Sequence, residues 1–205
     1  RSTLFPYTTL FRSHRDGKGV RAADRIRASA SELFYREGIR AVGVDEVVER
    51  AGVTKPSLYR SFASKDDLAA AYMRDYDLDF WEKFENPGGK SYSDPREHVL
   101  AYIRVLSTRA VREGYRGCGL SNATVEYPSR DNPARQVAEA HKKVFRKRLR
   151  ELAAGMGARQ PAVLGDALLL LIEGIYSTGQ QSEEGPAQSA LAVAKLLIDA
   201  SVTKG

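Results

Sequence analysis

The stretch GVDEVVERAGVTKPSLYRSFASK, from Gly43 to Lys65, decides the fold class of this 205-residue chain. Apolar residues recur at helical spacing in its first part, at Val44, Val47, Val48 and Ala51. That spacing predicts a short helix with one buried face. Gly52 follows the last of them, and a glycine in this place is a common helix end because it adopts a positive φ without steric cost.

A second short helix is predicted to follow this glycine turn. Thr54 supplies a hydroxyl that can cap it, and Pro56 falls in its first turn, where the missing N–H is harmless. Leu58, Tyr59 and Phe62 give the helix an apolar side. Two helices joined by a turn of about three or four residues that contains glycine describe a helix-turn-helix, whose second helix enters the DNA major groove. A helical pair of another type is the alternative.

Residues 53–68, VTKPSLYRSFASKDDL, resemble the recognition-helix region of the tetracycline-repressor (TetR) family. The family pattern runs from a Gly-Val-Ser/Thr turn through Leu-Tyr to Phe, then Ser-Lys and an acidic residue. The resemblance covers about residues 21 to 75 and is weaker beyond, where GCGLSNATVEYP (Gly117–Pro128) resembles a segment of the ligand-binding halves. It implies a sequence-specific DNA-binding transcriptional regulator, a homodimeric repressor that a small-molecule ligand releases from its operator.

The resemblance also indicates which side chains contact the DNA backbone. It implies that Thr54 contacts a phosphate, and that the Tyr59 hydroxyl reaches a phosphate while its ring packs on the domain. Lys65 is expected to contact the backbone as well. Ser61 stands where the family usually has Tyr or His, so one phosphate contact is expected to be shorter or lost.

Other side chains of the second helix are candidates for contacts with base edges. Lys55, Ser57 and Arg60 can reach the bases, where lysine or arginine commonly binds guanine. The complete set of predicted DNA-binding residues is Thr54, Lys55, Pro56, Ser57, Tyr59, Arg60, Ser61 and Lys65.

The net charge is concentrated in the same part of the chain. Residues 1–65 hold 13 Lys/Arg against 7 Asp/Glu, whereas residues 66–205 hold 19 of each, so the whole excess of +6 lies in the first part. This is expected of a DNA-binding surface, because phosphate neutralisation supplies much of the affinity. The basic run from Lys142 to Arg150 is predicted to be a solvated helix face, with a second nucleic-acid or membrane surface as the alternative.

The remaining composition is ordinary for a globular protein, with 42% hydrophobic and 28% charged residues. The single cysteine, Cys118, excludes an internal disulfide framework and fits a reducing compartment. No run of about 18 apolar residues predicts a membrane span, and no ligand spacing predicts a metal site. We expect a cytoplasmic protein that is not an enzyme and has no cofactor and no membrane partner.

No strand pattern is present, and the sequence predicts an all-α protein of about nine helices. A three-helix DNA-binding domain is expected at residues 21–66 and a helical ligand-binding and dimerisation domain at residues 67–205. Residues 1–20 are expected to form a disordered or artefactual leader. Its first part, RSTLFPYTTLFRS, has no helical period and resembles a translated sequencing-adaptor artefact, with a short native arm as the alternative.

A small-molecule site is predicted in the C-terminal part. His141 falls on the apolar stripe of its helix, and Cys118, Asn122 and Tyr127 come from the preceding segment. With Tyr102 they could line a cavity that combines an apolar wall with a few polar anchors. A histidine satisfied within the core is the alternative for His141. A Cys118–His141 nucleophile pair is formally possible, but no feature of the sequence activates the thiol.

Two helices near the C-terminus are predicted to form a dimer interface. The helix that begins at Pro161 is apolar nearly all round, more than one small domain can bury, and the last helix has an apolar stripe. Pairing with the same helices of a second subunit would place two recognition helices about one DNA turn apart. An entirely intramolecular core is the alternative. The predicted interface residues are Leu164, Leu168, Leu171, Ile172, Ile175, Leu191, Ala194, Leu197 and Ile198.

Overall fold

A computed structural model describes residues 21–179 and 185–202 of the chain. Within these residues it contains nine α-helices and two short 3-10 helices, which confirms the predicted all-α class. The α-helices are α1 (Ala22–Glu37), α2 (Val44–Ala51), α3 (Lys55–Ser61), α4 (Lys65–Glu85), α5 (Pro95–Ala110), α6 (Gly119–Glu126), α7 (Pro133–Gly155), α8 (Pro161–Thr178) and α9 (Ala190–Ser201). The predicted leader at residues 1–20 lies outside the described residues.

The chain divides into two compact units. Unit 1 runs to Asp79 and includes Asn122–Ala138, whereas unit 2 comprises Phe80–Ser121 and the residues from Glu139 onward. Helices α4, α6 and α7 therefore each contribute residues to both units. The domain boundary predicted at residue 66 falls at the start of α4, and the division into functional domains stays a prediction.

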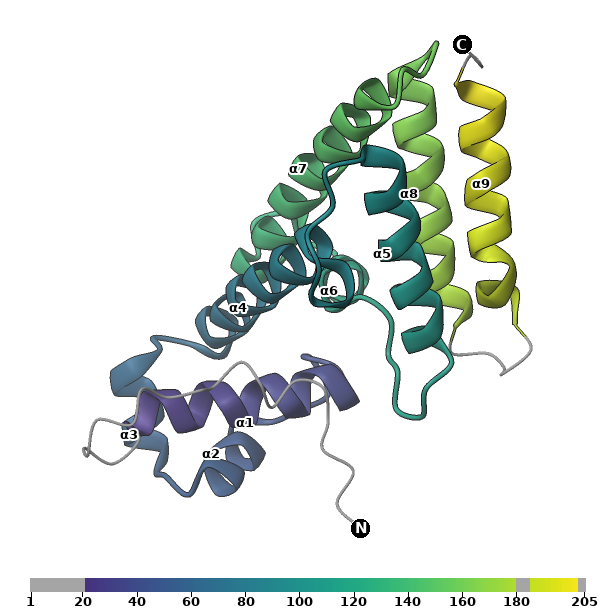
Figure 1. The fold of residues 1–205 in the computed structure, drawn as a ribbon. Helices are drawn as coiled ribbons and strands as arrows, with labels where there is room; N and C mark the ends of the chain where they lie inside the picture. The colour runs from purple at the N-terminus through teal and green to yellow at the C-terminus, as the bar shows by residue number, and fades with distance from the viewer. Residues whose placement is uncertain (1–20, 180–184, 203–205) are drawn as a thin grey trace. The chain divides into compact units, whose positions relative to one another are not determined.

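Unit 1 holds the predicted helix-turn-helix, in which α1 packs against both α2 and α3 (Figure 1). Ile26 of α1 and Leu58 of α3 are completely buried, and Val47 of α2 is 1% exposed. The ring of Phe34 meets the edge of Tyr72 on α4, with centroids 5.7 Å apart. These contacts anchor the inner side of each short helix and leave its outer side in solvent.

The helix end predicted at Gly52 is confirmed, whereas the cap predicted at Thr54 is not. Gly52 ends α2 in the left-handed conformation (φ 61°, ψ 43°), and its N–H donates to the last carbonyls of the helix. Ser64 caps α4: its hydroxyl accepts from the Asp67 N–H at 3.0 Å and donates to the Asp67 carboxylate at 2.8 Å. Thr54 is the residue before α3, but its side chain makes no capping hydrogen bond. The predicted Thr54 cap is wrong.

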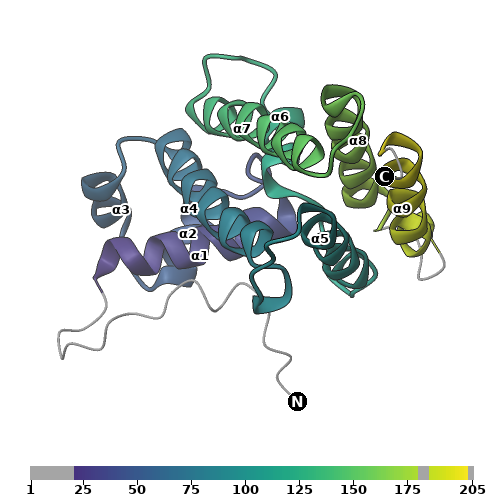
Figure 2. The same cartoon turned by 45° about the horizontal axis from the view of Figure 1, so that its top comes forward.

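In unit 2, helices α5, α8 and α9 lie side by side and contact one another (Figures 1 and 2). Aromatic rings fill the space beside α5: Phe84 lies edge-on to Tyr102 at 4.8 Å and to Phe145 at 5.0 Å. Gly165 of α8 lies against the backbone of α7, where a Cβ atom would sit 2.7 Å from Arg150 Cα. A glycine is required at this close approach because no real Cβ makes such a contact.

Within the described residues, α8 alone has the length and composition of a membrane-crossing helix, with a mean hydropathy of 1.3. The sequence predicted this apolar helix from Pro161 but predicted no membrane span. A third of the helix is buried against its own chain, including Leu164, Leu168 and Ile172. Core helices of globular proteins commonly have this composition.

Candidate nucleic-acid interface

Helix α3 presents most of the predicted DNA-binding side chains to solvent. Leu58 fixes the helix through its inner side, because this side chain is completely buried. The exposed residues of this segment are Thr54, Lys55, Pro56, Tyr59, Arg60 and Ser61, while Ser57 is partly buried. The Tyr59 side chain is 50% exposed. The short helix therefore offers hydroxyl, guanidinium, ammonium and phenol groups on one surface.

Ser57 organises the polar side chains along α3. The Arg60 guanidinium donates to the Ser57 hydroxyl at 2.8 Å, and the Thr54 hydroxyl lies 3.3 Å from the same oxygen. Ser61 donates to the Ser57 carbonyl at 3.2 Å, so its hydroxyl is directed to its own helix. Arg60 is thus held close to the helix surface by a neutral partner, with the rest of its five N–H donors available.

Lys55 is paired with an acidic residue of α2 that the sequence reading did not place in the site. Its Nζ lies 2.7 Å from Oδ1 of Asp45. The hydrogen bond and the negative charge of this carboxylate raise the pKa of Lys55. The two residues are ten positions apart on different helices, which no local pattern could have connected.

Lys65 is more buried than is expected of a side chain that contacts a DNA phosphate. It is partly buried, and its Nζ donates to the Arg40 carbonyl at 3.2 Å. Burial lowers its pKa, while the neighbouring carboxylates of Asp66 and Glu126 act in the opposite direction. In this structure Lys65 ties the start of α4 to the loop after α1, so its phosphate contact stays a prediction.

The C-terminal end of α6 is bound to the same loop within unit 1. The Glu126 carboxylate accepts the Arg40 N–H at 2.9 Å, and the Arg40 side chain lies 3.4 Å from the Glu126 carbonyl. Gly38 lies beneath this carboxylate, where a Cβ atom would be 3.3 Å from it. Gly38 also has a φ of 97°, which only glycine adopts readily. No sequence pattern predicted this contact, because residues 40 and 126 are far apart in the chain.

Two further contacts fix the segment around Glu126. The Tyr127 phenol hydrogen-bonds the Asp66 carboxylate, and burial together with this negative charge raises the pKa of Tyr127. Arg135 of α7 donates to the Tyr127 carbonyl at 2.6 Å and to the Thr124 carbonyl at 3.1 Å. Arg135 therefore satisfies carbonyls at the end of α6, where a helix has no partners of its own.

We expect Glu126→Ala to destabilise the protein by about 1–2 kcal/mol, because the charged acceptor of the Arg40 N–H is lost. Val125→Ala is the matched control, since this neighbouring side chain is 84% exposed. Urea denaturation measures the stability of both variants. Equal midpoints for the two variants would contradict the structural role of Glu126.

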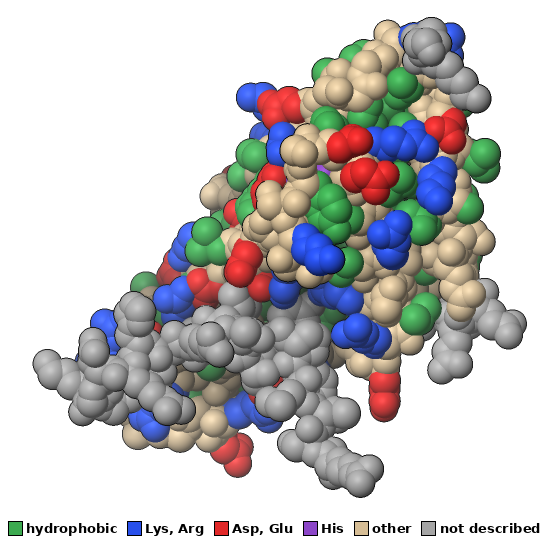
Figure 3. All heavy atoms as spheres, in the orientation of Figure 1, with side chains coloured by type: hydrophobic (Ala, Val, Ile, Leu, Met, Phe, Trp, Pro, Cys, Tyr) green, Lys and Arg blue, Asp and Glu red, His purple; other side chains and the backbone are tan. Residues whose placement is uncertain are grey.

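The basic run on α7 belongs to ion pairs inside unit 2. Arg146 and Arg150 both bind Asp166, with shortest distances of 2.6 Å, and these hydrogen bonds lower the pKa of that carboxyl group. Arg148 binds Glu85 at 2.8 Å, and Lys142 contacts Glu173. Basic and acidic side chains are interspersed over the visible face of unit 2 (Figure 3). Four basic side chains of the run are thus paired with carboxylates within unit 2.

The five predicted ligand-contacting residues are divided between the two units. Asn122 and Tyr127 belong to unit 1, and Tyr102, Cys118 and His141 belong to unit 2. The last three are buried, with 5%, 2% and 3% exposure. This distribution leaves the predicted site untested.

Within unit 2, the buried residues have different neighbours. The Tyr102 hydroxyl hydrogen-bonds Tyr176 of α8 at 2.6 Å, and burial raises the pKa of both phenols. The His141 ring instead meets Phe80 edge-on at 4.4 Å. Sequence reasoning missed Tyr176, because it lies 74 residues from its partner.

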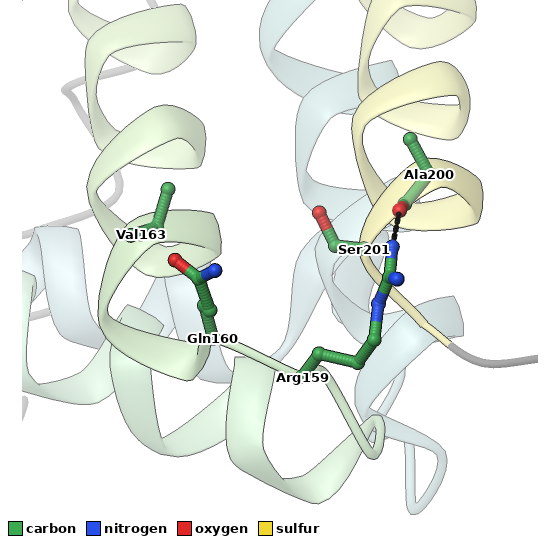
Figure 4. Close-up of a pocket in the computed structure, with 5 residues that line it drawn as sticks. All are labelled: Arg159, Gln160, Val163, Ala200 and Ser201. Carbon is green, nitrogen blue, oxygen red and sulfur yellow. Dashed lines mark hydrogen bonds between the residues drawn. The ribbon is translucent and has the colours of Figure 1, made fainter.

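A surface hollow of about 320 Å³ lies elsewhere in unit 2, between the start of α8 and the end of α9 (Figure 4). Its Arg159 side chain points to α9 and donates to the Ala200 carbonyl at 2.8 Å. An arginine in this place satisfies a free carbonyl at a helix end. The lining residues are Arg159, Gln160, Val163, Ala200 and Ser201, which include none of the predicted ligand contacts.

Most of the predicted interface residues on α8 and α9 are buried within their own chain, and the interface itself stays a prediction. Six of them are at most 2% exposed because they pack inside their own chain: Leu164, Leu168, Ile172, Ile175, Ala194 and Ile198. The other three, Leu171, Leu191 and Leu197, are partly buried. The apolar side chains that remain in solvent are Val163, Leu170, Val193 and Leu196, with exposures from 38% to 73%. We call these four residues the outer α8–α9 face.

Comparison with known proteins identifies the helix-turn-helix unit. Residues 26–72 match the family model of bacterial regulatory proteins of the tetR family. This segment of the chain is a DNA-binding domain of the TetR type. A TetR-family transcriptional regulator from Streptomyces coelicolor has a similar structure, with a TM-score of 0.82 and 29% identity over 89% of this chain and 96% of that chain. The TetR resemblance seen in the sequence is therefore confirmed.

Two curated relatives each match part of the chain. The HTH-type transcriptional activator FasR of Mycolicibacterium smegmatis is 48% identical over 50 residues, which are 24% of this chain and 23% of FasR. The transcriptional regulator AcuR of Cereibacter sphaeroides is 31% identical over 98 residues, 47% of this chain and 44% of AcuR. The chain thus spans less than half the length of these two relatives.

Proposed function

We propose that this protein is a sequence-specific DNA-binding transcriptional regulator of the TetR family, active as a homodimeric repressor in the cytoplasm. The observation that carries the proposal is the exposed side of α3, where Lys55, Tyr59 and Arg60 project beside a buried Leu58 anchor. An exposed short helix with donors for phosphates and bases is what entry into a major groove requires. The family match over residues 26–72 supports this assignment.

The outer α8–α9 face supports the homodimer. Leu170 and Leu196 are 73% and 70% exposed. Large apolar side chains gathered on two adjacent helices indicate a protein contact. A second copy is the natural partner, because two-fold symmetry brings the same face against itself and pairs two recognition helices.

A small-molecule effector completes the proposal. Its binding in the C-terminal helices would favour a conformation with the wrong separation of recognition helices. Helix α4 provides a continuous connection, because residues 65–79 belong to unit 1 and residues 80–85 to unit 2. Such coupling requires different effector affinities in two states, typically by about 1–3 kcal/mol. The second candidate function is a constitutive DNA-binding protein without an effector. A reporter gene placed under the operator found by selection would distinguish repression from activation.

Selection of bound sequences from random duplex DNA tests the central proposal. We expect a two-fold symmetric site whose half-sites lie about one DNA turn apart. Arg60→Ala is expected to relax the preference at one base pair of each half-site, at a cost of about 1–3 kcal/mol. Arg74→Ala, at an exposed position of α4, is the control. Failure to enrich any sequence would contradict the proposed function.

A further inference from the structure

The ion pair between Asp45 and Lys55 lies on the same surface as the predicted base contacts. Asp45 is in the first turn of α2 and Lys55 begins α3. The carboxylate and ammonium are 2.7 Å apart, yet their side chains are 79% and 53% exposed. Both charges therefore project into solvent beside the recognition helix, where bound DNA would replace the water.

A carboxylate at this place opposes general attraction to DNA. A free lysine ammonium is a flexible point charge that can bind any phosphate and release a counterion. Lys55 is already neutralised by Asp45, so moving it to a phosphate breaks one ion pair to make another. The uncompensated Asp45 carboxylate would then face the negative backbone.

Lys55 does not have to give up its ion pair with Asp45 where it binds a guanine. The ammonium has three donors, and the guanine edge offers two acceptors, N7 and O6. Lys55 can bind this edge with two N–H groups and keep Asp45 with the third. The ion pair survives at such a base, whereas it is exchanged at a phosphate.

We infer that Asp45 is a specificity-determining residue, which restrains Lys55 so that binding to unrelated DNA is weakened more than binding to the operator. The inference rests on the proposed function, because it assigns a role within the same DNA-binding surface. None of the predicted DNA-binding residues lies on α2, so this role for Asp45 extends the DNA-binding site to that helix.

The test measures binding of the full chain to two duplexes, the sequence enriched by selection and a scrambled version, at several salt concentrations. Asp45→Asn is compared with Glu46→Gln, which removes the same charge from the same exposed turn. We expect Asp45→Asn to tighten scrambled-DNA binding by about threefold to fivefold, as for loss of an exposed ion pair. The salt slope should steepen by about one phosphate contact, close to 0.9. Operator binding should change less, so the ratio of the two affinities should fall by about threefold.

Three outcomes separate the possibilities. Equal ratios for Asp45→Asn and Glu46→Gln would overturn the inference, because the effect would then follow net charge alone. Adding Lys55→Gln to Asp45→Asn should cancel the gain on scrambled DNA, and persistence of the gain would also overturn it. If the unchanged protein bound no duplex, the proposed function itself would fail, and this inference with it.

Discussion

Gly165→Ala is expected to destabilise the protein by about 2–3 kcal/mol, because the added methyl group has no space. Its Cβ would lie 2.6 Å from Arg150 Cγ and 2.7 Å from the backbone Cα and N of the same residue. Two of these atoms belong to the α7 backbone, so the helices themselves must separate. That movement would also disturb the pairing of Arg150 with Asp166, the residue next to the substitution.

Gly174→Ala provides a control in the same helix. A Cβ at Gly174 meets nothing within 4 Å, and alanine is a better helix former than glycine by up to about 1 kcal/mol. Urea denaturation should therefore show opposite shifts for the two variants. Both must be measured at one protein concentration, because the stability of a dimer depends on it. A Gly165→Ala protein as stable as the unchanged chain would contradict the close approach of α7 and α8.

Leu170→Glu is expected to convert the proposed dimer to a monomer and to lower operator affinity by a hundredfold or more. The substitution places a carboxylate at a side chain that is 73% exposed on the outer α8–α9 face. In a two-fold dimer this charge is buried opposite its own copy, which is costly because neither carboxylate has a partner. A monomer then loses the gain in effective concentration that links two half-sites.

Leu78→Glu tests whether any exposed leucine gives the same result. Leu78 of α4 is 70% exposed, so the chemical change and the exposure are matched while the face differs. Sedimentation gives the oligomeric state, and titration of the selected duplex gives the affinity. A Leu170→Glu protein that remains dimeric would show that another surface forms the interface. A monomeric unchanged protein would contradict the homodimer and leave the DNA-binding assignment of α3 intact.

Much of the local structure could be predicted because it depends on neighbouring residues. The Gly52 turn follows from the backbone freedom of glycine, and the Ser64 cap from a hydroxyl three residues before Asp67. The apolar spacing from Val44 to Ala51 specified the inner side of α2. The Thr54 cap is an exception even at this level, because the hydroxyl lies 3.3 Å from the Ser57 hydroxyl and makes no capping hydrogen bond. A cap depends on side-chain orientation, which sequence spacing does not report.

The sequence also indicated where function should be sought. The motif from Gly43 to Lys65 and the uneven charge pointed to the same segment as the family match over residues 26–72. The candidate residues of α3 followed from the motif. The partner of Lys55 did not, because Asp45 reaches it from another helix. The contact of Glu126 with the Arg40 N–H, which joins α6 to the loop after α1, was not predicted either.

By itself, then, the sequence determined the all-α class, the end of α2 at Gly52 and the helix-turn-helix, since all depend on short-range geometry and apolar period. Tertiary structure alone decided which side of α8 is free. Helix α8 is apolar nearly all round, so its sequence could not distinguish Leu168, which is completely buried, from Leu170, which is 73% exposed. Packing against α5, α7 and α9 makes that choice. The same packing pairs Tyr102 with Tyr176, because only the folded chain brings distant residues within hydrogen-bond distance.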